Sequence, residues 1–253
     1  MFWHAITRLP GENFANGLTT SDLGPPDYAL ILRQHYQYVE ALRSLGLQVT
    51  VLPPLLAFPD SYFVEDPAVV TDKVAIITRP GAISRRGEET SLAVILQQYR
   101  PLERLHAPGT LDGGDVLMAG KHFFIGISER TNSAGAEQLG RVLKYYGYTW
   151  ETVPVGAGLH LKSSVNWLGG KRLILTQSMA DYPGFADYKK LVVDPEEAYA
   201  ANTLWVNDCL LVPRGFPRTL EVLEQLGMPL IDLDVSEVRK MDGGLTCMSL
   251  RFA

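Results

Sequence analysis

Short apolar segments, polar turns and amphipathic segments follow one another along the chain in an order that repeats. The clearest copy begins with an apolar strand at residues 124–127. After a polar turn it continues into a segment with Ala136, Leu139 and Leu143 at spacings of three and four residues. That spacing predicts a helix with one buried face. Three further copies have the same order, with strands predicted at residues 76–80, 173–176 and 210–213 and helical segments at residues 92–96, around Tyr188, and from Pro217 to Gly227.

The two ends of the chain complete the pattern. A fifth copy starts at residues 5–8, which resemble residues 77–79, and its predicted helix follows Pro26 and ends at Gly46. The last copy ends at residues 249–252 without an outer strand, whereas the first copy has a spare strand at residues 2–8. Pairing of these ends would close a ring, which predicts one closed domain over residues 1–253. A short apolar strand also follows each helix, at residues 49–52, 105–107, 152–155, 191–193 and 230–233.

Residues suited to chemistry occur at the same place in every copy, in the loop beyond the strand that follows the helix. They are Asp66, Asp112, His160, Asn202 and Cys247, spaced 46, 48, 42 and 45 residues apart. A period in the forties is typical of repeat arrays and propellers. Equivalent loops of such an array face a common centre, so these positions predict an active site. An ordinary mixed α/β sheet with coincidental spacing is the alternative.

The composition argues against several classes of protein. A net charge of −5 does not favour nucleic acid as a partner, and no apolar run approaches the length that crosses a membrane. The N-terminus lacks the basic and apolar regions of a signal peptide, and the two cysteines lie far apart. These features predict a cytoplasmic protein, and a homodimer is compatible with them. No Cys or His pairs have zinc-ligand spacing, so we expect no metal and no cofactor.

Cys247 and His160 are the candidate nucleophile and proton carrier. Cys247 follows Gly243 and Gly244, which let the backbone turn sharply and approach a ligand. A lone cysteine is often only a small buried apolar residue, as we expect for Cys209 within its apolar strand. His160 is the histidine that falls at a repeat position, where an imidazole could transfer protons for a thiol. The shared phase favours the catalytic interpretation of both residues.

Acidic residues gather near these positions. Asp112 is in phase with the other candidates, whereas Asp115 starts the outgoing strand and is predicted to be structural; a plain β-turn is the alternative for both. Asp60, Glu65 and Asp66 lie within seven residues of an otherwise apolar stretch. Clustered buried carboxylates need a positive partner, which predicts a cationic substrate.

Two arginines add a second kind of contact. Arg85 and Arg130 follow the inner strands of their copies and could grip a carboxylate through paired hydrogen bonds, although solvated surface charge is the commoner role. The acidic residues would then hold a flat cation at Asp66 and Asp112 and an amine at Asp60. Arginine and its N-methylated relatives fit this description.

Several segments resemble those of the dimethylarginine dimethylaminohydrolase family, within the enzymes that modify guanidino groups. The resemblance runs from Met1 to Phe252 and includes the segments FPDSYFVEDP, ITRPGAISRRGE, TLDGGDVL, SERTN, LHLKS, AAN and DGGLTCMS. It implies a pentein-like fold, a five-bladed α/β propeller of ββαβ units. It also implies a dimethylargininase that hydrolyses methylated arginine to citrulline.

The resemblance further implies roles for particular residues. Cys247 would be the nucleophile, His160 the general acid and base, and Asp112 the third catalytic residue, where some bacterial members carry Glu. Asp66 with Asp112 would hold the guanidinium. The other substrate contacts would be the main chain of Leu18 with Asp60 at the amino end, supported by Glu65, then Arg85 and Arg130 at the carboxylate, and Met241 beside the nucleophile.

Two related enzyme activities and one non-catalytic function are alternatives to this interpretation. Arginine deiminases share the fold and the nucleophile, but they are longer and contain a helical insertion that this chain lacks. Agmatine deiminases need no carboxylate clamp, so a role for Arg85 and Arg130 argues against them. A non-catalytic propeller that binds the ribosome would not need Cys247 and His160 in phase, and an acidic chain suits a ribosomal surface poorly.

Overall fold

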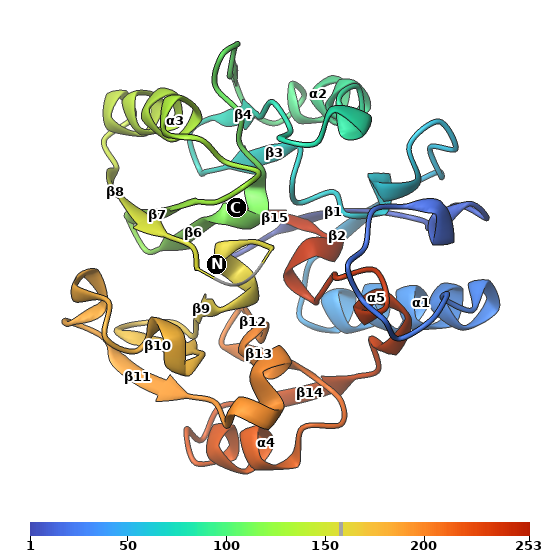
Figure 1. Ribbon diagram of the computed structural model, residues 1–253, viewed down its shortest axis with the longest axis vertical. Helices are drawn as coiled ribbons and strands as arrows, with labels where there is room; N and C mark the ends of the chain where they lie inside the picture. Colours follow the sequence, from blue (N-terminus) through green and yellow to red (C-terminus); the bar gives the residue numbers. More distant parts are fainter. Residues whose placement is uncertain (157–158) are drawn as a thin grey trace.

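The computed structural model describes residues 1–156 and 159–253. Within these residues, fifteen strands form five three-stranded sheets around a common centre (Figure 1). In order from sheet to sheet, the strands are β15 (Leu250–Phe252), β1 (His4–Arg8) and β2 (Gln48–Leu52); β3 (Ala68–Val70), β4 (Ala75–Ile77) and β5 (Leu102–Arg104); β6 (Val116–Ala119), β7 (His122–Ile127) and β8 (Thr149–Pro154); β9 (Val165–Trp167), β10 (Arg172–Leu175) and β11 (Lys189–Val192); and β12 (Leu204–Val206), β13 (Cys209–Pro213) and β14 (Leu230–Leu233).

Four of the five α-helices in the described residues connect the second and third strands of a blade, and the fifth lies between β14 and β15. The α-helices are α1 (Tyr28–Ser44), α2 (Glu89–Leu96), α3 (Ser133–Tyr145), α4 (Pro217–Glu224) and α5 (Ser236–Arg239). Short 3-10 helices lie at Phe14–Asn16, Pro59–Tyr62, Ile83–Arg85, Gly113–Asp115, Leu161–Ser163, Gln177–Met179, Pro183–Phe185, Pro195–Ala201 and Thr246–Met248. Helices α1 to α4 lie on the outer side of the ring (Figure 1).

All five sheets share one topology. The first two strands are antiparallel, and the third is parallel to the middle strand. A parallel pair needs a crossover connection, which α1, α2, α3 and α4 provide in four of the blades. This is the ββαβ unit, and the predicted five-bladed α/β propeller is confirmed.

The ends of the chain close the ring. Strand β15 pairs with β1, and the register joins His4 to Phe252 and Ile6 to Leu250. The spare N-terminal strand therefore supplies the partner that the last copy lacks, as the sequence predicts. Closure by the two termini supports the proposal of a single domain over residues 1–253.

Two predicted elements are wrong in place or type. The segment around Tyr188 is not helical: two 3-10 turns precede β11, and Pro183 and Gly184 in the second turn do not favour an α-helix. The outer strand expected at residues 105–107 lies at Leu102–Arg104 instead. Its side chains are half-buried or exposed because β5 is the outermost strand of its blade, so apolar residues do not mark it.

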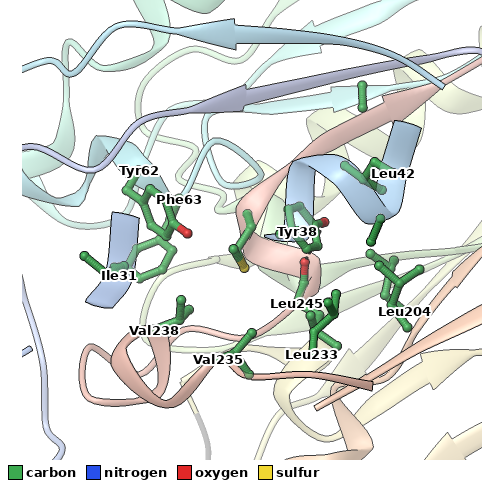
Figure 2. Packing of buried hydrophobic residues seen from close by; sticks show 14 of the residues in the cluster. Ile31, Tyr38, Leu42, Tyr62, Phe63, Leu204, Leu233, Val235, Val238 and Leu245 are labelled. Atoms are coloured by element: carbon green, nitrogen blue, oxygen red, sulfur yellow. Dashed lines mark hydrogen bonds between the residues drawn. The ribbon is translucent and has the colours of Figure 1, made fainter. Parts of the chain in front are cut away.

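Helix α1 supports the turn that carries Cys247. Asp27 caps its first turn by accepting a hydrogen bond from Leu30 N at 2.7 Å. Its buried face carries Ile31, Tyr38 and Leu42, and Figure 2 shows this face packed in one apolar cluster with Leu245. The Tyr38 hydroxyl lies 2.9 Å from Leu245 O and 2.6 Å from the Ser249 hydroxyl, so it fixes the chain on both sides of Cys247.

No helix among residues 1–156 and 159–253 is both long and apolar enough to cross a membrane.

Candidate active site

The loops that carry the in-phase residues all lead into the first strand of a blade. In chain order, these strands are β3, β6, β9, β12 and β15, which follow Asp66, Asp112, His160, Asn202 and Cys247. Equivalent strands begin at the same end of a propeller, so the loops meet there. Ala157 and Gly158, which the sequence places shortly before His160, lie outside the described residues.

Eight of the ten predicted site residues line one cavity. They are Leu18, Asp60, Asp66, Arg85, Arg130, His160, Met241 and Cys247, and Phe63, Leu159, Asp242 and Gly243 complete the lining. Cys247 and His160, which are far apart in the sequence, therefore line the same cavity, together with Asp60 and Asp66. Asp112 and Glu65 do not line this cavity.

His160 lies between two carboxylates. Its Nε2 is 3.1 Å from Asp112 Oδ2, and its Nδ1 is 4.0 Å from Asp66 Oδ1. Burial lowers the pKa of His160, but the charge of Asp66 and the hydrogen bond with Asp112 outweigh it and raise this pKa to about 9. The imidazole is therefore protonated at neutral pH and can act as an acid. Gly114 permits the close approach, since a Cβ there would lie 2.6 Å from His160 Nδ1.

Asp112 supports His160 from behind. Its side chain has no exposed surface, and its two oxygens are already engaged: Oδ1 accepts a hydrogen bond from Gly81 N at 2.9 Å, and Oδ2 faces His160. This geometry favours an orienting role for Asp112, for which the family resemblance implies the place of the third catalytic residue. It does not favour a direct contact between Asp112 and a guanidinium, which leaves Asp66 as the carboxylate that faces the cavity beside His160.

Asp66 is fixed by a buried arginine. Arg85 Nη1 donates to Asp66 Oδ2 at 2.5 Å, and Gly114 N donates to Asp66 Oδ1 at 2.9 Å. Burial raises the pKa of Asp66, but the charges of His160 and Arg85 overcome this effect and lower the pKa to about 2. Asp66 is therefore an anion throughout the neutral pH range and is suited to a cationic substrate.

Arg85 is more buried, and more of its N–H groups are hydrogen-bonded, than the sequence suggests. Only 4% of it is exposed; its Nε and Nη2 donate to Glu88, and Nη2 also donates to the Asp60 and Phe63 carbonyls at 3.2 Å. A guanidinium has five N–H groups, and a single one on Nη1 has no partner within the described residues. The contact of Arg85 with a substrate carboxylate therefore stays a prediction based on that one group. Arg130 is more accessible, with 18% of its side chain exposed.

Cys247 is half-buried and faces acidic groups. Burial and then the charges of Glu65 and Asp66 raise the pKa of Cys247 to about 12. Cys247, the predicted nucleophile, is therefore a thiol in the free protein. Cys209, by contrast, is buried in β13 as expected for a packing residue.

Asp60 and Leu18 lie together at the edge of the cavity. Asp60 Oδ1 accepts a hydrogen bond from Leu18 N at 2.9 Å, and burial raises the pKa of Asp60. A main-chain N–H can only donate, so the Leu18 carbonyl is the main-chain group that could accept a hydrogen bond from an ammonium. This arrangement is compatible with the predicted contact to an amino end.

Glu65 points away from the predicted pocket. Its Oε1 accepts from Lys162 Nζ at 2.6 Å and from Arg251 Nη2 at 3.2 Å, in a separate cavity on the other side of the Cys247 turn. Its backbone N–H bonds Cys247 O at 3.3 Å. Glu65 therefore supports the turn beneath the nucleophile, whereas a direct contact with the substrate has no geometric support.

A metal ion is disfavoured at the most suitable group of ligands. Single ligand atoms of Asp66, Asp112 and His160 lie within 4.8 Å of one another. However, a protonated His160 cannot coordinate a cation, which leaves only the two carboxylates as ligands in this group. The group is better suited to sharing protons.

Two residues outside the ten predicted site residues, Glu88 and Asp115, hold the site residues in place. Glu88, which anchors Arg85, was not singled out by the sequence, although it follows Arg85 by three residues. Asp115 is structural as predicted: it accepts hydrogen bonds from the Ser128 and Thr131 hydroxyls and from Leu161 N, beside His160. The sequence had no signal for either contact, because neither residue is in phase with the others.

The chain is similar in sequence to several known enzymes. The arginine deiminase family profile matches residues 30–155. The chain is 46% identical to N(G),N(G)-dimethylarginine dimethylaminohydrolase of Pseudomonas aeruginosa over the full length of both chains. It is 37% identical to the enzyme of the same name from Streptomyces coelicolor, with 98% of this chain and 96% of that one covered.

The chain is also similar to solved structures. The structure of the P. aeruginosa dimethylarginine dimethylaminohydrolase, a cysteine-to-serine variant complexed with citrulline, superimposes with a TM-score of 0.98 at 45% identity and covers 100% of both chains. The N-terminal domain of ArgZ, at 17% identity and a TM-score of 0.87, covers 98% of this chain and 97% of that one and shares the fold. The full-length identity to two enzymes of one name shows that this chain belongs to the dimethylarginine dimethylaminohydrolase family.

Proposed function

We propose that this protein hydrolyses Nω-methylated L-arginine to L-citrulline and methylamine or dimethylamine. The observation that carries the proposal is the 46% identity, over the whole of both chains, to the enzyme of P. aeruginosa that bears this name. The acid-lined cavity that holds Cys247 and His160 supports the chemistry. A hydrolase of this kind acts on a C–N bond of an amidine.

The first half of the reaction forms a covalent intermediate. The Cys247 thiol loses its proton to solvent when the cationic substrate binds, because a positive charge next to the sulfur favours the thiolate. The thiolate attacks the central guanidinium carbon and gives a tetrahedral adduct. Protonated His160 then donates its proton to the departing amine nitrogen, the C–N bond breaks, and a thiouronium remains on Cys247.

The second half releases citrulline. Neutral His160 removes a proton from water as the water oxygen attacks the thiouronium carbon. The new tetrahedral adduct collapses as its C–S bond breaks, the proton of its hydroxyl passes to the departing sulfur, and citrulline and the Cys247 thiol separate. Asp112 keeps the ring of His160 in place through both proton transfers, and Asp66 holds the positive charge that makes the carbon electrophilic.

Space beside the nucleophile suits the leaving amine. A second cavity of about 430 Å³ adjoins Cys247 and is lined by Tyr199, Asn202 and Gly244 among others. This volume is sufficient for the methyl groups of the guanidinium and for the amine that carries them away.

The decisive experiment compares three substrates. Purified protein is incubated with dimethylarginine, arginine and agmatine, and citrulline, carbamoylputrescine and the released amine are identified by mass spectrometry. Citrulline and dimethylamine from dimethylarginine support the proposal, with Cys247→Ser protein as the inactive control. Citrulline mainly from arginine would indicate a deiminase, and no product from any compound would favour a non-catalytic binding protein.

We also propose a cytoplasmic location and a homodimer. Both cysteines are free thiols, which fits a reducing compartment. Cell fractionation tests the location. Light scattering of the purified protein tests the dimer, and a monomeric mass at micromolar concentration would contradict it.

A further inference from the structure

Asn202 is the one in-phase residue without a part in the proposed mechanism. It follows the 3-10 helix Pro195–Ala201 and leads into β12, in the blade between those that carry His160 and Cys247. Only 5% of it is exposed. A buried carboxamide needs partners for both its donors and its acceptor, so its contacts show what it supports.

The Asn202 side chain joins the two catalytic turns. Its Nδ2 donates to Lys162 O at 3.0 Å, two residues after His160, and to Thr246 Oγ1 at 3.2 Å, next to Cys247. Its Oδ1 accepts from Thr246 N at 3.1 Å. A flipped amide would place Oδ1 against Lys162 O, so the three contacts determine its orientation.

The Cys247 turn packs directly on this amide. A Cβ on Gly244 would lie 2.5 Å from Asn202 Cγ, so the turn can approach only because residue 244 is glycine. Thr246 Oγ1 lies 3.9 Å from Cys247 Sγ. Because Nδ2 donates to an Oγ1 lone pair, the hydroxyl proton is free to point toward the sulfur, where it stabilises a thiolate.

We propose that Asn202 is a positioning residue for the hydrolysis. Its carboxamide fixes the Cys247 turn relative to the His160 turn and aims the Thr246 hydroxyl at the sulfur. The inference rests on the proposed function, because the two turns must supply the nucleophile and the acid of one reaction. It assigns a role to the fifth repeat position without placing Asn202 in contact with the substrate.

The main test is Asn202→Ala, measured by steady-state kinetics and by the pH dependence of alkylation of Cys247 in a Cys209→Ser background. We expect kcat to fall about 10–100-fold while KM changes by less than about threefold, because misplacement of reacting groups acts on the chemical step. We also expect the apparent pKa of the thiol to rise, since the sulfur loses an oriented donor. A kcat within about twofold of the parent protein, with an unchanged thiol pKa, would overturn the proposal.

Asn166→Ala is the matched control. Asn166 also donates to Lys162 O, at 2.7 Å, and to Ala201 O at 2.8 Å, but it has no hydrogen bond to the Cys247 turn. Its loss should lower the free energy of unfolding without shifting the thiol pKa. An equal pKa shift in both variants would show that Asn202 acts only through general stability.

A second pair of variants covers a failure of Asn202→Ala to fold. Thr246→Val removes the hydroxyl that Asn202 orients and should raise the thiol pKa, whereas Thr246→Ser should restore it. An unchanged pKa of the Cys247 thiol in Thr246→Val would contradict the claim that the Thr246 hydroxyl stabilises the thiolate. Alkylation needs no substrate, so a parent protein that produces no citrulline would refute the proposed function while the thiol measurements still decide the role of Asn202.

Discussion

The Nε2 atom of His160 lies 3.1 Å from Oδ2 of Asp112, a carboxylate with no exposed surface. This contact helps to raise the pKa of His160 to about 9, so the imidazole is protonated when it must donate to the leaving amine. In Asp112→Asn, we expect the pKa of His160 to fall toward its ordinary value. The protonated fraction then disappears at a lower pH, so the alkaline limb of the kcat profile should move to lower pH.

We expect kcat of Asp112→Asn at neutral pH to fall by about 100-fold, a common loss when general acid catalysis is impaired. The pH dependence of kcat and an NMR titration of His160 test this together. An unchanged alkaline limb would mean that His160 does not supply the proton, even if the variant is slow.

The sequence shows where the catalytic loops are but not where each side chain points. The repeat places Cys247 and His160 in equivalent loops that lead into a first strand, and from this their shared cavity could be predicted. Glu65 and Asp66 are adjacent, yet Asp66 faces the cavity of the nucleophile while Glu65 bonds Lys162 behind it. Both residues lie in the turn before β3, and which of the two side chains faces the site depends on the folded arrangement.

The hydrogen-bond partners of Arg85 also differ from those that the sequence suggested. A charged residue after an inner strand is usually solvated, and the sequence suggested a free grip for a carboxylate. The folded chain instead surrounds its guanidinium with Asp66, Glu88 and two carbonyls. Glu88 lies only three residues after Arg85, whereas Asp66 and the two carbonyls precede β3 and reach Arg85, which follows β4, only once this blade has folded.

The two cysteines should respond differently to the same substitution. Cys247→Ser should abolish turnover and leave the fold intact, because a serine hydroxyl is a far weaker nucleophile in the same position. Cys209→Ser should leave kcat nearly unchanged and lower the free energy of unfolding by about 1–3 kcal/mol, since it buries a hydroxyl within β13. Turnover and urea unfolding of both variants check this, and equal loss of activity would show that the assignment of the two thiols is wrong.

The Cys247 thiol should ionise more readily when a cation occupies the cavity. In the free protein, burial and the charges of Glu65 and Asp66 raise its pKa to about 12. A bound guanidinium offsets the carboxylates, so the apparent pKa should fall. Ultraviolet absorbance of the thiolate, in a Cys209→Ser background, measures it with and without a guanidino compound that binds but is not turned over. The same pKa in both states would contradict substrate-assisted ionisation.

Glu88 should influence substrate affinity through Arg85. Glu88 is 1% exposed and accepts hydrogen bonds from Arg85 Nε and Nη2, whose Nη1 holds Asp66. In Glu88→Gln, Asp66 becomes the only carboxylate paired with Arg85, so the two pair more tightly and Asp66 attracts a cationic substrate less. We expect KM to rise about tenfold, equivalent to about 1.4 kcal/mol. The free energy of unfolding should fall by about 1–3 kcal/mol, the range for hydrogen bonds to charged groups.

The pH dependence of KM makes this prediction specific. Burial raises the pKa of Glu88 to about 7, against the opposing charge of Arg85. Below that pH the side chain is neutral, as glutamine is, so KM of the parent protein should rise toward that of Glu88→Gln as the pH falls through 7. Glu89→Gln is the control, because Glu89 bonds Gly87 N and not Arg85. If Glu88→Gln loses stability but keeps the parent KM at every pH, Glu88 braces the fold alone and Asp66 binds the substrate independently of it.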